Sequence, residues 1–264
     1  MTASVGVDLS LHAESAADVV LSIVPATGWA VDETLSVTVD GRPVPPVELL
    51  DAHGTRVHRL SLPRGEASIQ YRGEVAAPAT PAPSDELDPV RYLRPSRYVP
   101  SDDQRMVDVL DVGDAAPREL VQRVPEWVSN HLRYVPGASG PTHSALDTLR
   151  EREGVCRDYA HLTIALLRAA GVPARLVSVF APGLEPMDFH AVVEAFVEGR
   201  WEVVDATRLA PRTHLVRIAT GRDAADTAFL TTLSGAVMLR SVEVTAVARA
   251  DLRHDDHAAA VLLR

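Results

Sequence analysis

The hydrophobic pattern of this chain changes its period twice, and that change limits the folds open to it. Apolar residues alternate with polar ones through about residue 75, for instance around the hairpin signal Asp40-Gly41 in TLSVTVDGRPV. From Ser101 to Gly171 they recur at helical spacing, and beyond Gly171 the alternation returns. Strands, then helices, then strands again predict an α+β protein whose helices pack on an antiparallel sheet.

The same pattern divides the chain into three predicted parts. Residues 1–75 are expected to form a small N-terminal β-domain, residues 76–100 a linker, and residues 101–264 a core of helices and strands. The linker is indicated by VAAPATPAPSDELDPV, in which four prolines stand among alanines and acids.

Composition excludes several classes of function. The 264 residues include 36 Asp or Glu and 26 basic residues, all of them Arg, so a broad basic face for nucleic acid is not expected. Without lysine, no internal amine can form a Schiff base or accept an acyl group. No apolar run reaches the ~18 residues of a membrane helix, and no secretory signal is seen. With a single cysteine, which excludes an internal disulfide, we expect a cytoplasmic protein.

That cysteine, Cys156, stands where a loop gives way to a helix. SALDTLREREG predicts a short helix capped by Ser144 and stopped by Gly154, and RDYAHLTIALLRAAG predicts the next one, closed by Gly171. Free N–H groups at a helix start favour a thiolate and can bind an oxyanion. The alternative is a small buried hydrophobic residue, as most free cysteines are. His161, five residues on, is expected to point away and to pack or lie at the surface.

A nucleophilic thiol needs a base, and the base needs an orienting partner. HAVVEAFVEGRWEVVDAT predicts two strands joined by a turn near Glu198-Gly199. If the strands pair across that two-residue turn, alternation puts His190 and Asp205 on one face as diagonal neighbours, with Thr207 opposite His190, but the sequence does not specify the exact register. Asp205 can then accept from one ring nitrogen while the other faces the thiol. The alternative for this pair is a surface ion pair.

GVCRDYAHL and FHAVVEAFVEGRWEVVDAT resemble the transglutaminase-like superfamily, whose fold is shared with papain-type cysteine proteases. WVSNHLRYVPG and GRDAADTAF are also similar to bacterial members, and the resemblance covers most of the chain but is weak before about residue 75. It implies a papain-like core with Cys156 as nucleophile, His190 as general base and then acid, and Asp205 as orienting carboxylate. Val192 is a departure, because many members have Trp after His-Ala, and it can alter the cleft wall.

The resemblance also implies an oxyanion hole. The backbone N–H of Cys156 is the first expected donor. A second donor is expected from Asn130 or Tyr134, since papain-type enzymes use a side chain located before the cysteine. For Asn130, a solvated helix residue is the favoured interpretation over an oxyanion donor.

We therefore expect a cysteine-dependent acyl-transfer enzyme that acts on peptide or isopeptide amides of peptides or proteins through a thioester. Water is the expected acceptor, because nothing visible supplies an amine tunnel. Transfer to an amine, as by a transglutaminase, and a non-catalytic binding module on the same fold are the alternatives. No cofactor or metal is expected, since no EF-hand or clustered carboxylate loop is found, and HDDH at 254–257 is expected to be a solvated patch.

Overall fold

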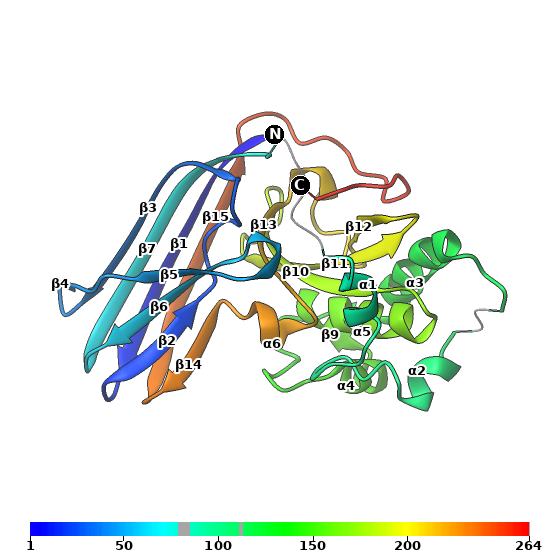
Figure 1. Cartoon of the computed structure of the whole chain (residues 1–264), viewed down its shortest axis with the longest axis horizontal. Coiled ribbons are helices and arrows are strands. Elements are labelled where there is room, and N and C mark those ends of the chain that lie inside the picture. Colours follow the sequence, from blue (N-terminus) through cyan, green and yellow to red (C-terminus); the bar gives the residue numbers. More distant parts are fainter. Residues whose placement is uncertain (79–84, 111–112, 264) are drawn as a thin grey trace.

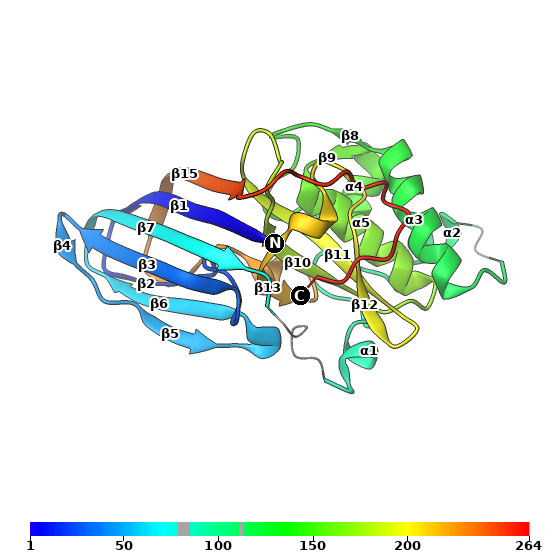
Figure 2. The same ribbon diagram turned by 90° about the horizontal axis from the view of Figure 1, so that it is seen from above.

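This computed structural model describes residues 1–78, 85–110 and 113–263. A pair of sheets, a third sheet and a group of helices follow one another along the molecule (Figure 1). Two sheets form one end of the molecule, a third sheet lies in the middle, and helices cover the far face of that sheet (Figures 1 and 2). The predicted α+β class, with helices on an antiparallel sheet and a β region at the N-terminus, is confirmed.

The two sheets at one end, together called the β-layer here, are both antiparallel. The larger has the strand order β15-β1-β7-β3-β4 and the smaller the order β14-β2-β6-β5. Positive φ angles at Asp40 and Gly41 form the predicted turn between β3 and β4. The strands of the β-layer are β1 (Thr2–Ala13), β2 (Ala17–Leu21), β3 (Ala30–Val39), β4 (Arg42–Pro43), β5 (Val47–Leu50), β6 (Arg56–Leu62), β7 (Gly65–Ala76), β14 (Leu230–Ser234) and β15 (Val237–Ala248).

The last two of these strands correct the expected extent of the core. Residues 230–248 leave the core and return to the β-layer, where Ala248 of β15 lies opposite Ala3 and Leu230 of β14 lies opposite Leu21. The sequence shows alternating apolar and polar residues in this segment, but that alternation does not specify which strand it will pair with. The return buries the inward side chains Val244 and Ala246 in the same apolar cluster as β1.

The middle sheet has the order β12-β11-β10-β13 and is covered on both sides. In β10, Val177 and Val179 pack toward the β-layer, while Ala174 and Leu176 pack toward the helices. Every residue of β10 is buried, as is typical of a strand between two covering layers. The strands of this sheet are β10 (Ala174–Phe180), β11 (Phe189–Val197), β12 (Arg200–Val204) and β13 (Val216–Gly221).

The helices follow the predicted periodicity. Pro117 occupies the first turn of the longest helix, α3, which runs through Pro125 without interruption and buries Leu120, Val124 and Val128. No helix in the described part of the chain has the length and apolar character needed to cross a membrane. The helices are α1 (Asp88–Arg91), α2 (Gln104–Asp108), α3 (Pro117–His131), α4 (Ala145–Glu151), α5 (Cys156–Ala169) and α6 (Ala224–Thr227).

The predicted linker, residues 76–100, lies partly outside the described residues, at 79–84. Its later part packs closely on its neighbours. Tyr92 is 3% exposed, and its hydroxyl oxygen lies 2.9 Å from Nε2 of His53 in the β-layer. The Tyr92 carbonyl accepts a hydrogen bond from the Ala174 N–H (3.1 Å), which ties this segment to β10.

Candidate active site

Cys156 is the first residue of α5, as the sequence predicts, and its side chain is partly exposed. The helix start is fixed by Asp158, whose carboxylate accepts hydrogen bonds from the Val155 N–H (2.8 Å) and the Ser139 hydroxyl. A Cβ atom at Gly154 would lie only 2.6 Å from the Asp158 Cβ, so only glycine fits beside this cap. These contacts hold the sulfur at the free N–H end of a 14-residue helix.

Strands β11 and β12 bring His190 and Asp205 together. Val197 pairs with Arg200 across a turn at Glu198-Gly199, and the ladder continues to Val193 opposite Val204. This is the register expected if the strands pair across that turn. It places Asp205 one residue beyond the end of β12, beside the start of β11.

The His190 Nε2 lies 2.9 Å from the Asp205 Oδ2, and both side chains are almost fully withdrawn from solvent. The other carboxylate oxygen, Oδ1, accepts hydrogen bonds from the Thr207 N–H (2.8 Å) and hydroxyl (2.7 Å). Asp205 is thus held on both sides, and the predicted surface ion pair is ruled out by burial. Sequence reasoning did not assign Thr207 a role, although Asp205-Ala206-Thr207 has the spacing of an Asx turn.

The electrostatics of the pair favour a charged ring. Burial alone would lower the pKa of His190, but the Asp205 charge, its hydrogen bond and the nearby Cys156 side chain raise it to about 10. For Asp205, burial acts to raise the pKa, but His190 and Thr207 outweigh it and hold the pKa below its ordinary value. The site therefore stabilises an imidazolium next to a carboxylate.

The thiol of Cys156 lies near the His190–Asp205 pair. Its side chain interacts with His190, and Nε2 is already occupied by Asp205. The His190 Nδ1 atom is buried and has no hydrogen-bond partner of standard geometry among the described residues. The structure thus places Cys156 and the His190–Asp205 pair at one cleft, with the His190 Nδ1 atom not engaged by Asp205.

Cys156 and His190 both line an open cleft of about 600 Å³ between the core and the β-layer. The volume is in the range of small-molecule and peptide side-chain pockets. Arg157 and Asp188 are its charged lining residues, and burial raises the pKa of Asp188. Arg157 also donates to the Gly140 carbonyl oxygen (2.8 Å), which fixes the loop beside the cysteine.

The two side chains proposed from the sequence as a second oxyanion donor are placed differently. Asn130 is exposed on α3 and does not line the cleft. Tyr134 lies next to Cys156, because Tyr134 in β8 (Arg133–Tyr134) pairs with Gly154 in β9 (Glu153–Gly154). Burial and the Cys156 side chain raise the pKa of Tyr134, while a hydrogen bond from the Cys156 backbone opposes them.

Two further features from the sequence have structural explanations. His161 is fully buried, stacks on Tyr98 at 5.4 Å and accepts a hydrogen bond from the Ala224 N–H (3.1 Å), so it packs and does not lie at the surface. Burial lowers its pKa to about 3. In HDDH, Asp255 forms an ion pair with the Arg212 guanidinium (2.8 Å) and is only 5% exposed, so this segment is not simply a solvated patch.

Helices packed against an antiparallel sheet, with a cysteine at the start of α5, make a papain-like fold. Residues 104–206 match the model of the transglutaminase-like superfamily. A solved structure from Cytophaga hutchinsonii, named a "putative cysteine protease", is 31% identical, covers 97% of this chain and 93% of its own, and has a TM-score of 0.86. The chain belongs to the transglutaminase-like superfamily.

Two other proteins are also similar. An uncharacterized protein of Mycobacterium leprae is 32% identical over 158 residues, which are 54% of this chain and 54% of that protein. The match thus spans about half of that relative's length. The periplasmic domain of TgpA from Pseudomonas aeruginosa is 21% identical and covers 76% of this chain and 90% of its own, with a TM-score of 0.40. Together, the family model and the Cytophaga structure support a cysteine-type enzyme.

Proposed function

We propose that this protein is a hydrolytic acyl-transfer enzyme that cleaves peptide or isopeptide amide bonds through a thioester on Cys156. The observation that carries the proposal is the buried His190–Asp205 pair, whose free ring nitrogen opens toward the thiol in an accessible cleft. A merely structural cysteine has no need of an imidazole held in one orientation by a buried carboxylate.

In the resting state, His190 already holds the proton of the thiol, and in the first half of the reaction the thiolate sulfur of Cys156 attacks the amide carbon. The tetrahedral intermediate carries its charge on oxygen, where the Cys156 N–H can donate to it. The imidazolium of His190 then gives its proton to the leaving nitrogen, the C–N bond breaks, and an amine departs. Asp205 stays ionised throughout and holds the ring in place.

In the second half, water attacks the thioester while His190 accepts a proton from it. The C–S bond breaks, a carboxylic acid is released, and the proton taken from water stays on His190 beside the thiolate. Cys156 and His190 are thereby restored, so no further reactant is needed.

Tyr134 is the better candidate for a second oxyanion donor. Its hydroxyl lies close to the Cys156 backbone N–H and side chain, although Tyr134 is 40% exposed and, like Asn130, does not itself line the cleft. In the proposed intermediate, the Tyr134 O–H and the Cys156 N–H donate to the same oxygen. Tyr134→Phe should lower kcat by about 10²-fold or more, the scale known for one oxyanion donor.

The test is a screen of peptide and isopeptide amides with product identification by mass spectrometry. Cys156→Ala and His190→Ala should abolish turnover, while His131→Ala, which removes an exposed histidine outside the cleft, should keep it. A primary amine added to the assay separates the two acceptors, because hydrolysis gives an acid and transfer gives a new amide. Turnover retained in Cys156→Ala would refute the proposal.

A further inference from the structure

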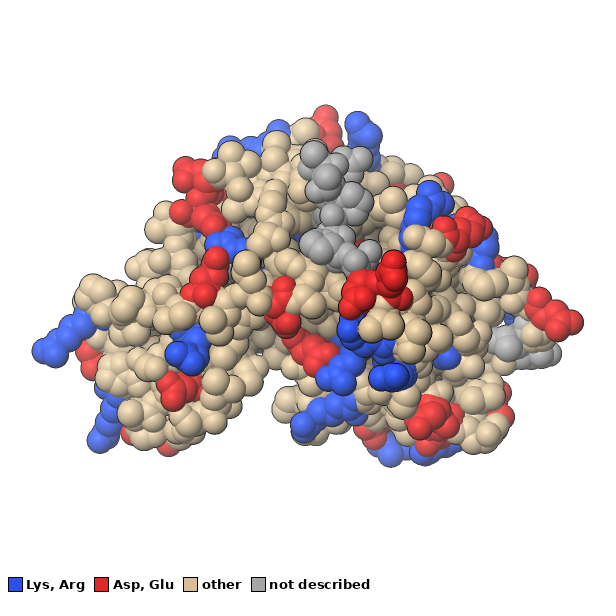
Figure 3. All heavy atoms as spheres, viewed as in Figure 1, with Lys and Arg blue, Asp and Glu red and all other residues tan. Residues whose placement is uncertain are grey.

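The cleft has two walls of different origin. One wall belongs to the core and carries Cys156 and His190, and the other belongs to the β-layer. The space-filling view is hollowed along the lower side between these two parts of the molecule (Figure 3). The β-layer contributes lining residues from β14 and β15, namely Leu230, Thr231, Leu239 and Val242.

These two strands lie at the open edges of their sheets. β14 is the outermost strand of the smaller sheet and β15 that of the larger. Leu239 lies opposite Leu11 of β1, which is fully buried, yet Leu239 itself remains 40% exposed. Val242 is 37% exposed, although Val244, two residues along the same face, is buried. The apolar inner face of the larger sheet is therefore partly uncovered at Leu239 and Val242, where it borders the cleft.

Two aromatic rings join the walls beside the reactive groups. Phe189, directly before His190, stacks on Phe229, directly before β14, with centroids 5.3 Å apart. Both rings are half-buried and line the cleft, so part of their surface faces the open space. The two rings form an apolar surface that extends from β11 to β14 at the edge of the β-layer.

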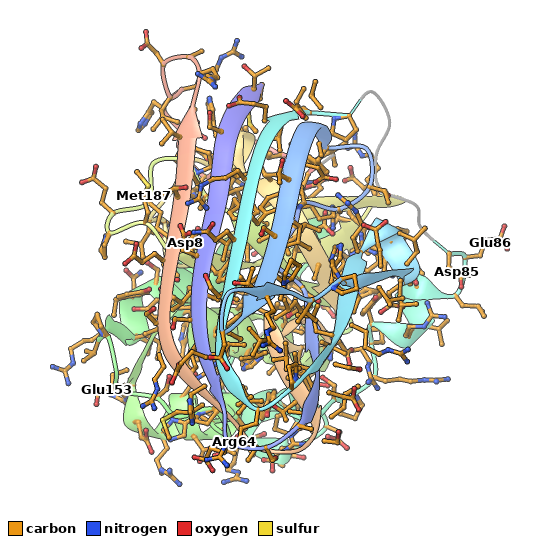
Figure 4. All side chains as sticks on the ribbon, turned by 90° about the vertical axis from the view of Figure 1, so that its left-hand side faces the viewer. Asp8, Arg64, Asp85, Glu86, Glu153 and Met187 are labelled. Carbon is orange, nitrogen blue, oxygen red and sulfur yellow. The ribbon has the colours of Figure 1, made fainter. Side chains whose placement is uncertain are left out.

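The charged side chains of the cleft lie on the core wall. Arg157 and Asp188 come from α5 and from the loop before β11, whereas the described lining residues from the β-layer are uncharged. The loop before β11 also contacts β15, because the Ala246 N–H donates to the Met187 sulfur (3.5 Å), and Met187 lies beside β15 in Figure 4. The cleft thus has charged side chains on its core side and apolar side chains on its β-layer side.

We propose that the uncovered edge of β14 and β15 is a substrate-binding subsite for one aliphatic or aromatic side chain of the amide substrate, next to the scissile carbonyl. This inference rests on the proposed function, because the subsite is taken to hold part of the amide substrate on the ground that it lines the same cleft as Cys156. Burying such a side chain against Leu239, Val242 and Phe229 releases apolar surface from water on both partners. The β-layer thereby selects substrates whose group beside the scissile bond is apolar.

Two chloromethyl ketones test this subsite, N-acetyl-phenylalanyl and N-acetyl-asparaginyl. In each, the sulfur of Cys156 forms a C–S bond as chloride leaves, so the second-order rate of alkylation reports binding beside the thiol. For the unaltered protein we expect the phenylalanyl compound to react about tenfold faster, equivalent to burial of roughly 50 Å² of apolar surface. Leu239→Asp should bring the ratio of the two rates close to one, and the isosteric Val242→Thr should lower it by roughly half.

Met238→Asp is the matched control. Met238 is the neighbour of Leu239 on the same strand, is 44% exposed and does not line the cleft, so its substitution should preserve the ratio. Equal rates for the two ketones in the unaltered protein, or a preference that survives both Leu239→Asp and Val242→Thr, would overturn the inference. Iodoacetamide, which carries no side chain, reports separately on the reactivity of Cys156. An unreactive thiol there refutes the proposed function instead.

Discussion

The Nε2 atom of His190 lies 2.9 Å from the Oδ2 atom of Asp205, and neither side chain is more than 1% exposed. Two charges withdrawn from water in this way are tolerated when each satisfies the other with good geometry. The pair fixes the orientation of the ring and leaves Nδ1 as the nitrogen that, in the proposed mechanism, serves Cys156. Breaking the pair should therefore affect both the reactivity of the thiol and the stability of the fold.

Replacing Asp205 by asparagine should remove the charge that keeps the His190 ring protonated and oriented. We expect kcat on an amide substrate to fall by about 10⁴-fold, the scale known for an orienting carboxylate in a triad. Asp8→Asn is the control, because Asp8 pairs with Arg72 on the outer face of the β-layer (Figure 4). Equal losses in the two variants would show that Asp205 has no special role.

His190 should also make stability depend on pH. Its pKa rises from 6.5 to about 10 on folding, so the folded state holds the proton more tightly. The stabilisation is fully present below pH 6.5 and is lost as pH increases toward about 10. The free energy of unfolding of the unaltered protein, minus that of His190→Gln, should therefore fall across this interval in urea titrations. A difference that stays constant from pH 6.5 to 10 would contradict the assignment.

Gly154→Ala should destabilise the start of α5. The added Cβ would lie 2.6 Å from the Asp158 Cβ, and Asp158 caps Val155 beside the cysteine. Overpacking of this kind costs about 1–3 kcal/mol, measurable as a lower urea midpoint. Gly140→Ala is the control, since its Cβ would approach only His143, at 3.9 Å. A midpoint for Gly154→Ala no lower than for the control would show that the contact is readily relieved.

Asp255→Ala should release the segment that follows β15. Asp255 and Arg212 are each 5% exposed and form an ion pair, and the Arg212 guanidinium also donates to the Ala259 carbonyl (3.0 Å). Removing one partner leaves a buried charge uncompensated, at a cost of about 3–5 kcal/mol. Thermal unfolding should show this loss, and trypsin should cleave after Arg253 sooner. Asp251→Ala, at an exposed position of the same segment, should behave like the unaltered protein.

Local signals in the sequence predict the positions of Cys156 and of the β11–β12 turn. Cys156 begins α5 because a stop signal and a helical pattern meet there, and Glu198-Gly199 sets a two-residue turn that fixes the register of Asp205. Each of these features is specified by residues within a few positions of one another.

Long-range pairing could not be predicted in the same way. β15 pairs with β1, more than 220 residues earlier, and nothing in its alternation specifies that neighbour. Tyr134 reaches Cys156 through its pairing with Gly154, whereas Asn130, four residues earlier, remains on the exposed side of α3. The β-layer wall of the cleft depends on the long-range pairing of β14 and β15, so that wall became visible only in the structure.

The most direct test of the activated thiol is the rate of iodoacetamide alkylation at pH 6, mapped by mass spectrometry. Cys156 is the single cysteine, so the label reports one site, and the same chain unfolded in urea supplies the reference. An ordinary thiol, with a pKa of ~8.5, is almost entirely protonated and unreactive at this pH. We predict that the folded protein reacts at least about tenfold faster than the unfolded chain, and that His190→Ala removes the advantage. A folded protein that reacts no faster than the unfolded chain would contradict a cysteine activated by His190.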